Sequence, residues 1–377
     1  MKVALVHDWL TGTRGGEKVL RELARLFPDA PVYTLFHFPG TAPAEIESRR
    51  VETTWLQRLV SPDRDYRHLL PLFPIAAEGW DLSGFDLVVS SSHCVAKAAR
   101  RGPRGFHLCY CHTPVRYLHD QLDEYLRTRG PLFRAAARLA RAPLRALDVA
   151  TVPRVDAFLA NSENVRERIA RLYGRTARVV PAPVDTSFYV PAPSSRAREG
   201  LLVVSALVPY KRVEDAIAAS GLLGLPLTVA GTGPEETRLR ALAGPNVRFA
   251  GSPSDEDLRE LYRLAELVLM PGEEDFGIVP LEAQACGTPV VALGKGGARE
   301  TVLDGRTGVF YPGPGAGPLA RAIETARAMR FDPAEAAANA RRFSERAFRD
   351  RFLAAAREAL LEAGRADLAA ALPDEGP

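Results

Sequence analysis

The stretch "MPGEEDFGIVPLEAQACGTPVV", residues 270–291, decides the fold. It begins at the last residue of the apolar run "LVLM" (267–270) and continues into three consecutive acids, a glycine and a second apolar segment. Carboxylates repel each other and resist burial. An apolar run that stops at such a cluster therefore predicts a buried strand whose end opens onto a polar site.

The residues after the acids predict a tight turn and the start of a helix. Gly277 permits the turn and a close backbone approach. A helix that begins near Ile278 tolerates Pro280 in its first turn. The N–H groups of Ile278 and Val279 have no partners within such a helix, so they are expected to face a ligand, and phosphate suits them.

Two glutamates, Glu274 and Glu282, flank this predicted helix start. Glu274 precedes the turn and Glu282 lies one turn into the helix, so both carboxylates can face the same cavity. Ionised carboxylates accept hydrogen bonds bidentately, and two of them suit a ligand rich in hydroxyl groups. The alternative is that the acids only stabilise the helix dipole, which accounts for Glu282 better than for Glu274.

The rest of the chain predicts an α/β fold with parallel sheets. Short apolar runs alternate with longer helical patterns, as in βαβ units. Strands are predicted at residues 2–6, 86–90, 106–110, 157–161, 201–206, 227–231, 247–250, 267–270 and 289–293. Residues 179–200 hold four prolines and predict a linker. We therefore expect two doubly wound, Rossmann-like domains, 1–185 and 186–349, that face each other across a cleft, with ligands beyond the strand C-termini.

Composition excludes several classes. A length of 377 residues suits two domains, and a net charge of +3 does not indicate a nucleic-acid-binding protein. Four cysteines do not form a disulfide framework. "CYCH" (109–112) lacks a second cysteine or histidine pair at the spacing of a zinc finger, so buried cysteines on a strand are favoured over a metal site. No signal peptide and no run of about 20 apolar residues is found, which predicts a cytoplasmic protein.

Two other strand ends carry candidate residues in the first half. Gly15 and Gly16 lie in a glycine-rich loop that opens a helix, where backbone N–H groups can bind an anion. The alternative, a turn that needs positive φ, is equally compatible with the sequence. His112 follows a predicted strand, and all seven histidines lie at or before His119. Any catalytic imidazole must therefore come from the first half, although a structural histidine is the more common case.

Two cations mark a strand end in the second half. Lys211 and Arg212 lie where a loop enters a helix, and cations there oppose the helix dipole. An anionic ligand such as a diphosphate would account for them, and a pair of solvated surface cations is the alternative.

The segment Arg127–Arg154 is strongly basic. It holds seven arginines and one acid, Asp148, with leucine and phenylalanine between them. This pattern is typical of an amphipathic surface that rests on anionic lipid. The alternative is a solvated, arginine-rich helix pair.

These motifs together resemble a known family. The spacing from Glu274 to Glu282 matches the E-x7-E motif of retaining GT-B glycosyltransferases of family 4. Four further stretches are similar to that family or to its bacterial mannosyltransferase branch of surface polysaccharide assembly: "TRGGEKVL" (13–20), "CHTPVRYLHD" (111–120), "VSALVPYKRVEDAI" (204–217) and "GGARETVLDGRTGVFYP" (296–312). The resemblance spans residues 1 to about 350.

The resemblance implies a role for each half. The first domain lies on the acceptor side, and a C-terminal helix at about 350–370 packs back on it. The second domain binds a nucleotide diphosphate sugar, with GDP-mannose favoured. The acceptor is a glycan or a lipid-linked sugar. The reaction retains the anomeric configuration, and no cofactor or metal is expected.

The resemblance also assigns the site residues. Glu274 binds hydroxyls of the transferred sugar, Glu282 binds the ribose, and Lys211 neutralises the departing β-phosphate. His112 approaches the sugar from the first domain. The backbone amides that cradle phosphate and sugar lie at Gly15, Gly16 and Gly277 to Val279.

One position departs from the family pattern. Ala206 stands where the family usually has an arginine, and Arg212 is the candidate replacement for that charge. A nucleotide-sugar epimerase of the same fold and a non-catalytic sugar-nucleotide-binding protein remain as alternatives. A nicotinamide-dependent oxidoreductase is disfavoured because the first strand is not followed by G-x-G-x-x-G.

Overall fold

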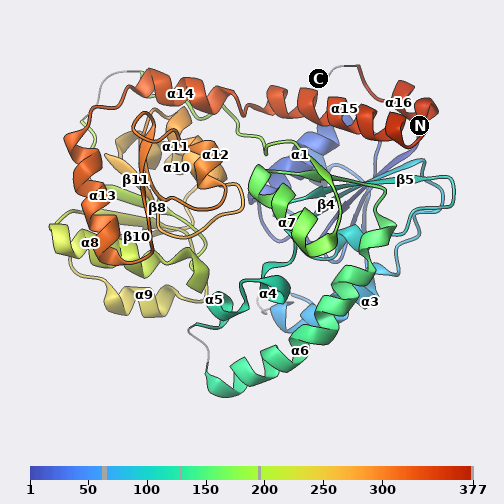
Figure 1. The fold of residues 1–377 in the computed structure, drawn as a ribbon, viewed down its shortest axis with the longest axis horizontal. Coiled ribbons are helices and arrows are strands. Elements are labelled where there is room, and N and C mark those ends of the chain that lie inside the picture. The colour runs from blue at the N-terminus through green and yellow to red at the C-terminus, as the bar shows by residue number, and fades with distance from the viewer. Residues whose placement is uncertain (62–65, 128–129, 194–196, 375–377) are drawn as a thin grey trace. The chain divides into compact units, whose positions relative to one another are not determined.

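The structure is a computed structural model and describes residues 1–61, 66–127, 130–193 and 197–374. The chain forms two compact units. Unit 1 comprises Met1–Leu122, Arg129–Pro183 and Glu345–Pro377, and unit 2 comprises Asp123–Thr128 and Val184–Ser344. Each unit contains a parallel sheet with flanking helices (Figure 1). The predicted class, two α/β domains of Rossmann-like architecture, is confirmed.

Unit 1 is built on a seven-stranded parallel sheet in the order β3-β2-β1-β4-β5-β6-β7. Its strands are β1 Val3–His7, β2 Val32–Thr34, β3 Val51–Thr53, β4 Leu87–Ser92, β5 Phe106–Cys111, β6 Ala157–Ala160 and β7 Ala177–Val179. Every residue of β1, β4 and β5 is buried, the serines and histidines included, as expected for parallel strands covered on both faces. Chain order reverses between β1 and β4, and such a switch point is where doubly wound sheets bind ligands.

Helices cover this sheet. They are α1 Gly15–Leu26, α2 Ala44–Glu47, α3 Phe73–Ala77, α4 Arg116–His119, α6 Pro131–Ala150, α7 Glu163–Tyr173, α15 Glu345–Glu362 and α16 Ala366–Ala370. In α1, five apolar residues (Val19, Leu20, Leu23, Ala24 and Leu26) are buried on one face. The C-terminal helix α15 packs against α1 through Glu22, which pairs with Arg25 and Arg349, and through the rings of Phe27 and Phe352.

Unit 2 repeats the plan with six strands in the order β10-β9-β8-β11-β12-β13. They are β8 Leu201–Val204, β9 Leu227–Ala230, β10 Val247–Gly251, β11 Leu267–Met270, β12 Val290–Leu293 and β13 Gly308–Tyr311. The helices are α8 Val213–Leu223, α9 Glu236–Leu242, α10 Asp255–Leu264, α11 Ile278–Ala285, α12 Ala298–Thr301, α13 Ala316–Ala328 and α14 Pro333–Arg341. Here chain order reverses between β8 and β11.

All nine strands predicted from the sequence are present, and four others were not predicted. The missed strands are β2, β3, β7 and β13, each of three or four residues. β3 and β7 contain no buried residue, so their sequences lack the apolar run that identified the others. Cys109 and Cys111 are buried on β5, as expected.

One short segment lies in a different unit from the one that the sequence predicts. Asp123–Thr128 falls within the predicted first domain but belongs to unit 2. The ring of Tyr125 stacks on Tyr210 with centroids 4.8 Å apart. Arg127 pairs with Glu214 and donates to the carbonyl oxygen of Pro209 at 2.6 Å. These contacts attach the segment to unit 2. They join residues that are far apart in the sequence, so no sequence pattern indicates them.

A buried ionic cluster fixes the end of α6 in unit 1. The Asp148 carboxylate contacts the Lys97 ammonium, and it accepts hydrogen bonds from His119 Nε2 at 2.7 Å and from the Tyr173 hydroxyl at 3.0 Å. Lys97 also donates to Thr151 Oγ1 at 3.0 Å. Burial alone would raise the pKa of Asp148, but Lys97 and His119 lower it. The cluster therefore stabilises the fold above the carboxyl's unfolded pKa and loses that contribution as pH falls.

We predict that Asp148→Ala destabilises unit 1 by about 3–5 kcal/mol, because the Lys97 ammonium would remain buried without its counter-ion. Urea unfolding followed by far-UV circular dichroism measures the change. Glu163→Ala removes a carboxylate from an exposed pair with Arg166 on α7 and serves as the control, with little expected effect. Equal losses in the two variants would show that the cluster is not a stabilising feature.

Candidate functional site

The turn between β11 and α11 has the predicted form. Gly277 adopts φ +90° and precedes α11, which begins at Ile278 as predicted. A β-carbon at Gly277 would lie 3.3 Å from Met270 Cε, so both backbone angle and space favour glycine. Gly277, which precedes α11, has no side chain to cap the first turn, and within the described residues the N–H groups of Ile278 and Val279 donate no hydrogen bond. These N–H groups are therefore available for an anion.

The structure brings Lys211 and Glu274 into direct contact. The Lys211 ammonium pairs with Glu274 Oε1, and both side chains are about one-fifth exposed. Lys211 follows β8 and Glu274 follows β11, so the pair lies at the switch point of unit 2. An ammonium has three donors. Lys211 can thus hold the carboxylate and an oxygen of a second anion at the same time.

Glycines hold the Glu274 loop in place. Gly297 N donates to Glu274 O at 2.9 Å, and Glu274 and Gly296 form a backbone bridge. A β-carbon at Gly296 would overlap the carbonyl oxygen of Glu274, and one at Gly272 would lie 2.8 Å from Lys211 Cα. These glycines are needed for close backbone approach. Sequence reasoning did not assign them, although "GKGG" (294–297) is a visible signal.

Glu282 lies in a different environment from Glu274. Its residue is 3% exposed, and Oε2 accepts a hydrogen bond from the Tyr262 hydroxyl on α10 at 2.8 Å. Tyr262 is itself fully buried and was not predicted as a site residue. The tyrosine orients the carboxylate, since one oxygen is fixed by the hydroxyl. The expectation that Glu274 and Glu282 face one cavity stays a prediction.

Arg212 combines an unusual backbone with a paired side chain. It is the single non-glycine residue with positive φ, +53°, in the described part of the chain. Such strain often accompanies functional sites. Its guanidinium donates to Asp215 Oδ2 at 2.9 Å and lies 3.7 Å from Glu124. Arg212 is the predicted replacement for the arginine that is absent at position 206. Because two carboxylates already face its guanidinium, Arg212 can offer less positive charge to a ligand.

The first-half candidates meet in unit 1. His112 follows β5, and its Nε2 lies 2.8 Å from Ser91 Oγ. Gly15 opens α1, and a β-carbon on Gly16 would lie 3.2 Å from His7 Cε1 and 3.8 Å from His112 Nε2. Gly16 therefore allows two imidazoles to approach the start of α1. This packing accounts for the glycine more directly than anion binding does, and neither Gly15 nor Gly16 has positive φ.

His112 is neutral at physiological pH. Burial, followed by the neighbouring His93 and His7, lowers the pKa of His112 to about 3. The neutral ring can therefore donate or accept a hydrogen bond, but it does not contribute positive charge. Sequence reasoning selected His112 without its partners His7, Ser91 and His93. Their signal was the polar residues that directly follow the apolar runs of β1 and β4.

Comparison with known families covers both units. Residues 13–188 match the family model described as Glycosyltransferase Family 4, and residues 193–345 match the one described as Glycosyl transferases group 1. Only residues 1–12, 189–192 and 346–377 lie outside the two matches. The chain is a glycosyltransferase of the group 1 and family 4 type.

Curated relatives match part of this glycosyltransferase. A D-inositol 3-phosphate glycosyltransferase of Acidothermus cellulolyticus is 34% identical over 196 residues, 43% of this chain and 43% of the relative. One from Mycobacterium tuberculosis is 35% identical over 208 residues, 48% of this chain and 43% of the relative. The matches thus span less than half of the length of these relatives.

Solved structures share the fold over nearly the whole length. Sucrose-phosphate synthase from Thermosynechococcus elongatus superposes with a TM-score of 0.72 at 19% identity, covering 96% of this glycosyltransferase and all of that chain. Anabaena HepE with UDP-glucose gives 0.66 at 20% identity, covering 93% and 98%. At these identities the likeness concerns the fold, and GT-B architecture is thereby supported for this glycosyltransferase.

We predict that Gly296→Ala destabilises unit 2 more than Gly305→Ala does. Both glycines have positive φ, +60° and +73°, so each substitution introduces backbone strain of about 1–2 kcal/mol. Only Gly296 faces the Glu274 carbonyl, whereas nothing lies within 4 Å of a β-carbon at Gly305. Overpacking should add about 1–3 kcal/mol. Urea unfolding of both variants measures the difference, and equal losses would contradict the close approach.

Proposed function

We propose that this protein transfers a hexose from a nucleotide diphosphate sugar to a hydroxyl group of a glycan or lipid-linked acceptor. The observation that carries the proposal is the contact of Lys211 with Glu274 in the same unit as the uncapped start of α11. A bound phosphate is stabilised by a cation and by the N–H groups of a helix start, and the hydroxyls of a bound sugar donate hydrogen bonds to a carboxylate. Both requirements are met by residues that follow β8 and β11.

Leaving-group stabilisation is assigned to Lys211. When the bond between the sugar and the β-phosphate breaks, its electron pair goes to the phosphate oxygen. Lys211 and the N–H groups of Ile278 and Val279, after the turn at Gly277, would stabilise that charge because they are held in place before the reaction. Arg212 would add a weaker contribution, since Asp215 and Glu124 already face it. No metal ion or cofactor is required in this scheme.

The carboxylates are assigned to the neutral parts of the donor. Glu274 would accept hydrogen bonds from hydroxyls of the transferred sugar while it stays in contact with Lys211. Glu282, oriented by Tyr262, would accept hydrogen bonds from the ribose hydroxyls. His112, with neutral imidazole, would bind a sugar hydroxyl without adding charge.

The finer assignment rests on the resemblance and on related proteins. The motifs resemble retaining mannosyltransferases of surface polysaccharide assembly, so we propose retention of configuration and GDP-mannose as the donor. HepE structures with UDP and with UDP-glucose make a uridine donor the competing case. The relatives named D-inositol 3-phosphate glycosyltransferases make a phosphorylated polyol a competing acceptor.

We predict that Lys211→Ala lowers the rate of sugar release from the donor about 10- to 150-fold, because one charge-assisted contact of about 1.5–3 kcal/mol is lost. The measurement is release of nucleoside diphosphate from GDP-mannose, UDP-glucose and ADP-glucose, with a bacterial lipid extract as the acceptor source. Lys211→Arg should retain part of the rate, since it keeps the charge.

Lys2→Ala is the control, because Lys2 is an exposed lysine outside the candidate site. Thermal shifts with GDP, UDP and ADP sugars establish first which donor binds, and about 2.7 kcal/mol of stabilisation is expected at a hundredfold excess over Kd. Binding of none of the three by the wild type would overturn the proposal. A fully active Lys211→Ala variant would move the leaving-group role elsewhere.

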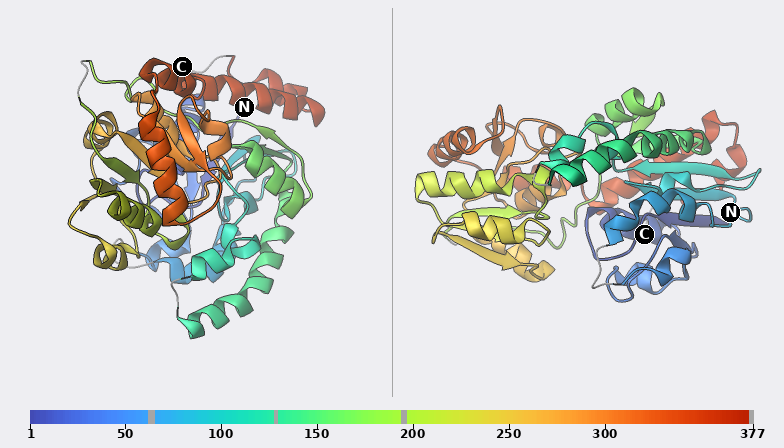
Figure 2. Two further views of the ribbon diagram at one scale, coloured as in Figure 1. Left: turned by 60° about the vertical axis from the view of Figure 1, so that its left-hand side comes forward. Right: turned by 90° about the horizontal axis from the view of Figure 1, so that it is seen from below.

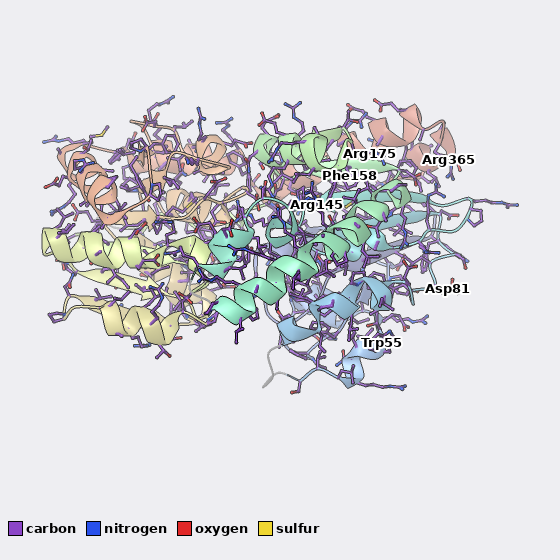
Figure 3. All side chains as sticks on the ribbon, turned by 60° about the horizontal axis from the view of Figure 1, so that its bottom comes forward. Trp55, Asp81, Arg145, Phe158, Arg175 and Arg365 are labelled. Atoms are coloured by element: carbon purple, nitrogen blue, oxygen red, sulfur yellow. The ribbon has the colours of Figure 1, made fainter. Side chains whose placement is uncertain are left out.

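We further propose that α6 holds unit 1 against anionic lipid. Figure 2 shows α6 as one long helix on the outside of unit 1. A single helix, Pro131–Ala150, is found instead of the helix pair of the alternative interpretation. Leu132 and Leu139 are 87% and 80% exposed. Arg134, Arg138 and Arg145, the last labelled in Figure 3, recur at the spacing of one helix face.

Within the basic segment Arg127–Arg154, we assign the lipid contact to α6. Arg127 is engaged by Glu214 within unit 2. Arg154 pairs with Glu78 and donates to the carbonyl oxygen of Ala98 at 2.7 Å. Arg129 lies outside the described residues. Among the described residues, no helix is both long and apolar enough to cross a bilayer.

Replacing Arg134, Arg138 and Arg145 together with alanine should weaken binding to vesicles of phosphatidylglycerol and phosphatidylcholine by about 3 kcal/mol, at about 1 kcal/mol for each arginine. Vesicle co-sedimentation at low and high salt measures it. Three exposed arginines of unit 2, Arg321, Arg330 and Arg341, provide the matched triple control. If the wild type does not sediment with anionic vesicles at low salt, the lipid proposal is wrong.

A further inference from the structure

Three strand ends gather polar side chains at the switch point of unit 1. β1 ends at His7 and is followed by Asp8, β4 ends with Ser91 and Ser92 and is followed by His93, and β5 is followed by His112. His7 is the register partner of Ser91, and β4 also pairs with β5. These ends therefore share one edge of the sheet, which is the ligand-binding edge in doubly wound folds.

Asp8 is a fully buried carboxylate, and both of its oxygens accept hydrogen bonds. Oδ1 accepts backbone N–H bonds from Val95 and Ala96 at 2.6 and 2.7 Å, and Oδ2 accepts them from His93 and Cys94 at 2.7 and 3.0 Å. His93 Nδ1 lies 3.0 Å from Oδ2. Burial would raise the pKa of Asp8, but the charge and hydrogen bonds of His93 lower it well below its usual range. Asp8 is thus a fixed anion.

Asp8 fixes the tautomer and the direction of His93. Because a carboxylate faces Nδ1, the proton of the neutral ring lies on Nδ1 and the lone pair lies on Nε2. The ring packs edge-on against Trp9, with centroids 4.5 Å apart. The side chain is 32% exposed. In the described part of the chain, no group hydrogen bonds to Nε2, so its lone pair is open to a ligand.

The other two imidazoles of the cluster are turned inward. His7 Nδ1 and His112 Nε2 lie 3.1 and 2.8 Å from the same Ser91 hydroxyl. Burial lowers the pKa of His7 to about 4, and that of His112 is about 3. In contrast, the attraction and hydrogen bond of Asp8, with the more distant Glu17, outweigh burial and raise the pKa of His93. His93 is the basic member of the group.

We propose that the His93–Asp8 pair is a binding site for a hydroxyl group of the sugar acceptor: Nε2 of His93 accepts the hydroxyl's hydrogen bond, and Asp8 positions the ring. The inference rests on the proposed function, because it names the group that unit 1 presents to the acceptor. An acceptor hydroxyl needs an acceptor atom of this kind to orient its lone pairs toward the reacting carbon. Asp8 is a positioning residue.

The surroundings favour a neutral hydroxyl over a phosphate or a metal ion. Two carboxyl groups, Asp8 and Glu17, lie in the cluster, and Glu17 already accepts the Arg14 backbone N–H at 3.0 Å at the start of α1. These two carboxyl groups oppose a phosphate, and Arg14 is the cation that faces the same ring. In the described ranges, no group of three or more histidine, cysteine, aspartate or glutamate side chains is arranged to hold a metal ion.

The site has a defined pH dependence. Protonation of His93 removes the lone pair of Nε2, so the hydrogen bond that the hydroxyl donates to Nε2 is present above the pKa of His93 and is lost as pH falls through it. The titratable and charged groups near the ring are His7 and Asp8 at the end of β1, Arg14 and Glu17 at the start of α1, and His112 after β5. Because Asp8 raises the pKa of His93, the loss begins at a higher pH than for a free imidazole.

The test uses the full chain with ring-labelled histidine and three polyol probes: methyl α-mannoside, methyl α-glucoside and myo-inositol. We expect saturable shifts of the His93 ring resonance with at least one probe. His93→Phe keeps a ring against Trp9 and should reduce the affinity for that probe at least tenfold. His93→Gln keeps an acceptor oxygen and should bind with an affinity that no longer changes with pH. His37→Gln, at a histidine that instead pairs with Glu47, is the control.

Each outcome decides the inference. Shifts of His93 with inorganic phosphate but with none of the polyols would overturn it, as would unchanged polyol affinity in a folded His93→Phe variant. Retention of the wild-type pH dependence in His93→Gln would place the titrating group elsewhere. Nucleotide-sugar binding, measured separately, distinguishes the two proposals. If the wild type binds no nucleotide sugar, the proposed function is wrong. If it binds a nucleotide sugar but the His93 resonance does not shift with any polyol, only this inference is wrong.

Discussion

The contact between the Lys211 ammonium and the Glu274 carboxylate is the interaction on which the site in unit 2 depends. The two residues are 63 positions apart and meet because β8 and β11 are neighbouring parallel strands whose C-terminal ends share one edge. Neither charge could remain there at low cost alone, since a partly buried charge needs a partner. The pair keeps the site charged and ordered, and Gly272 and Gly296 allow the two loops to approach closely enough for the contact.

Unit 1 uses the same topological solution for different chemistry. At its switch point, between β1 and β4, a carboxylate meets an imidazole rather than an ammonium. Asp8 takes four backbone N–H groups and so costs little to bury, whereas Glu274 has a single cation as its main partner. The first arrangement fixes a ring, and the second holds a cation that a ligand can share.

The sequence predicted those parts of the site that lie within one short segment. The strand end, the turn at Gly277 and the start of α11 at Ile278 follow from apolar patterning, glycine and proline in consecutive positions. Contacts between residues that are far apart in the sequence could not be predicted from it. Nothing local indicates that Tyr262 holds Glu282, or that Tyr125 attaches its segment to Tyr210. The short strands β3 and β7 were missed because they bury no residue completely.

The distribution of charge separates the tasks of the two units under the proposed mechanism. Transfer needs positive charge at the leaving phosphate and none at the attacking oxygen, because a cation there would lower its nucleophilicity. Unit 2 carries Lys211 and Arg212 at its switch point. In unit 1, burial keeps His7 and His112 neutral, and His93 accepts the proposed hydroxyl's hydrogen bond in its neutral form. The absence of an arginine at Ala206 fits this balance only if Lys211 supplies most of the charge, because Asp215 and Glu124 already face Arg212. The proposed chemistry thus rests more heavily on Lys211 than on any other side chain.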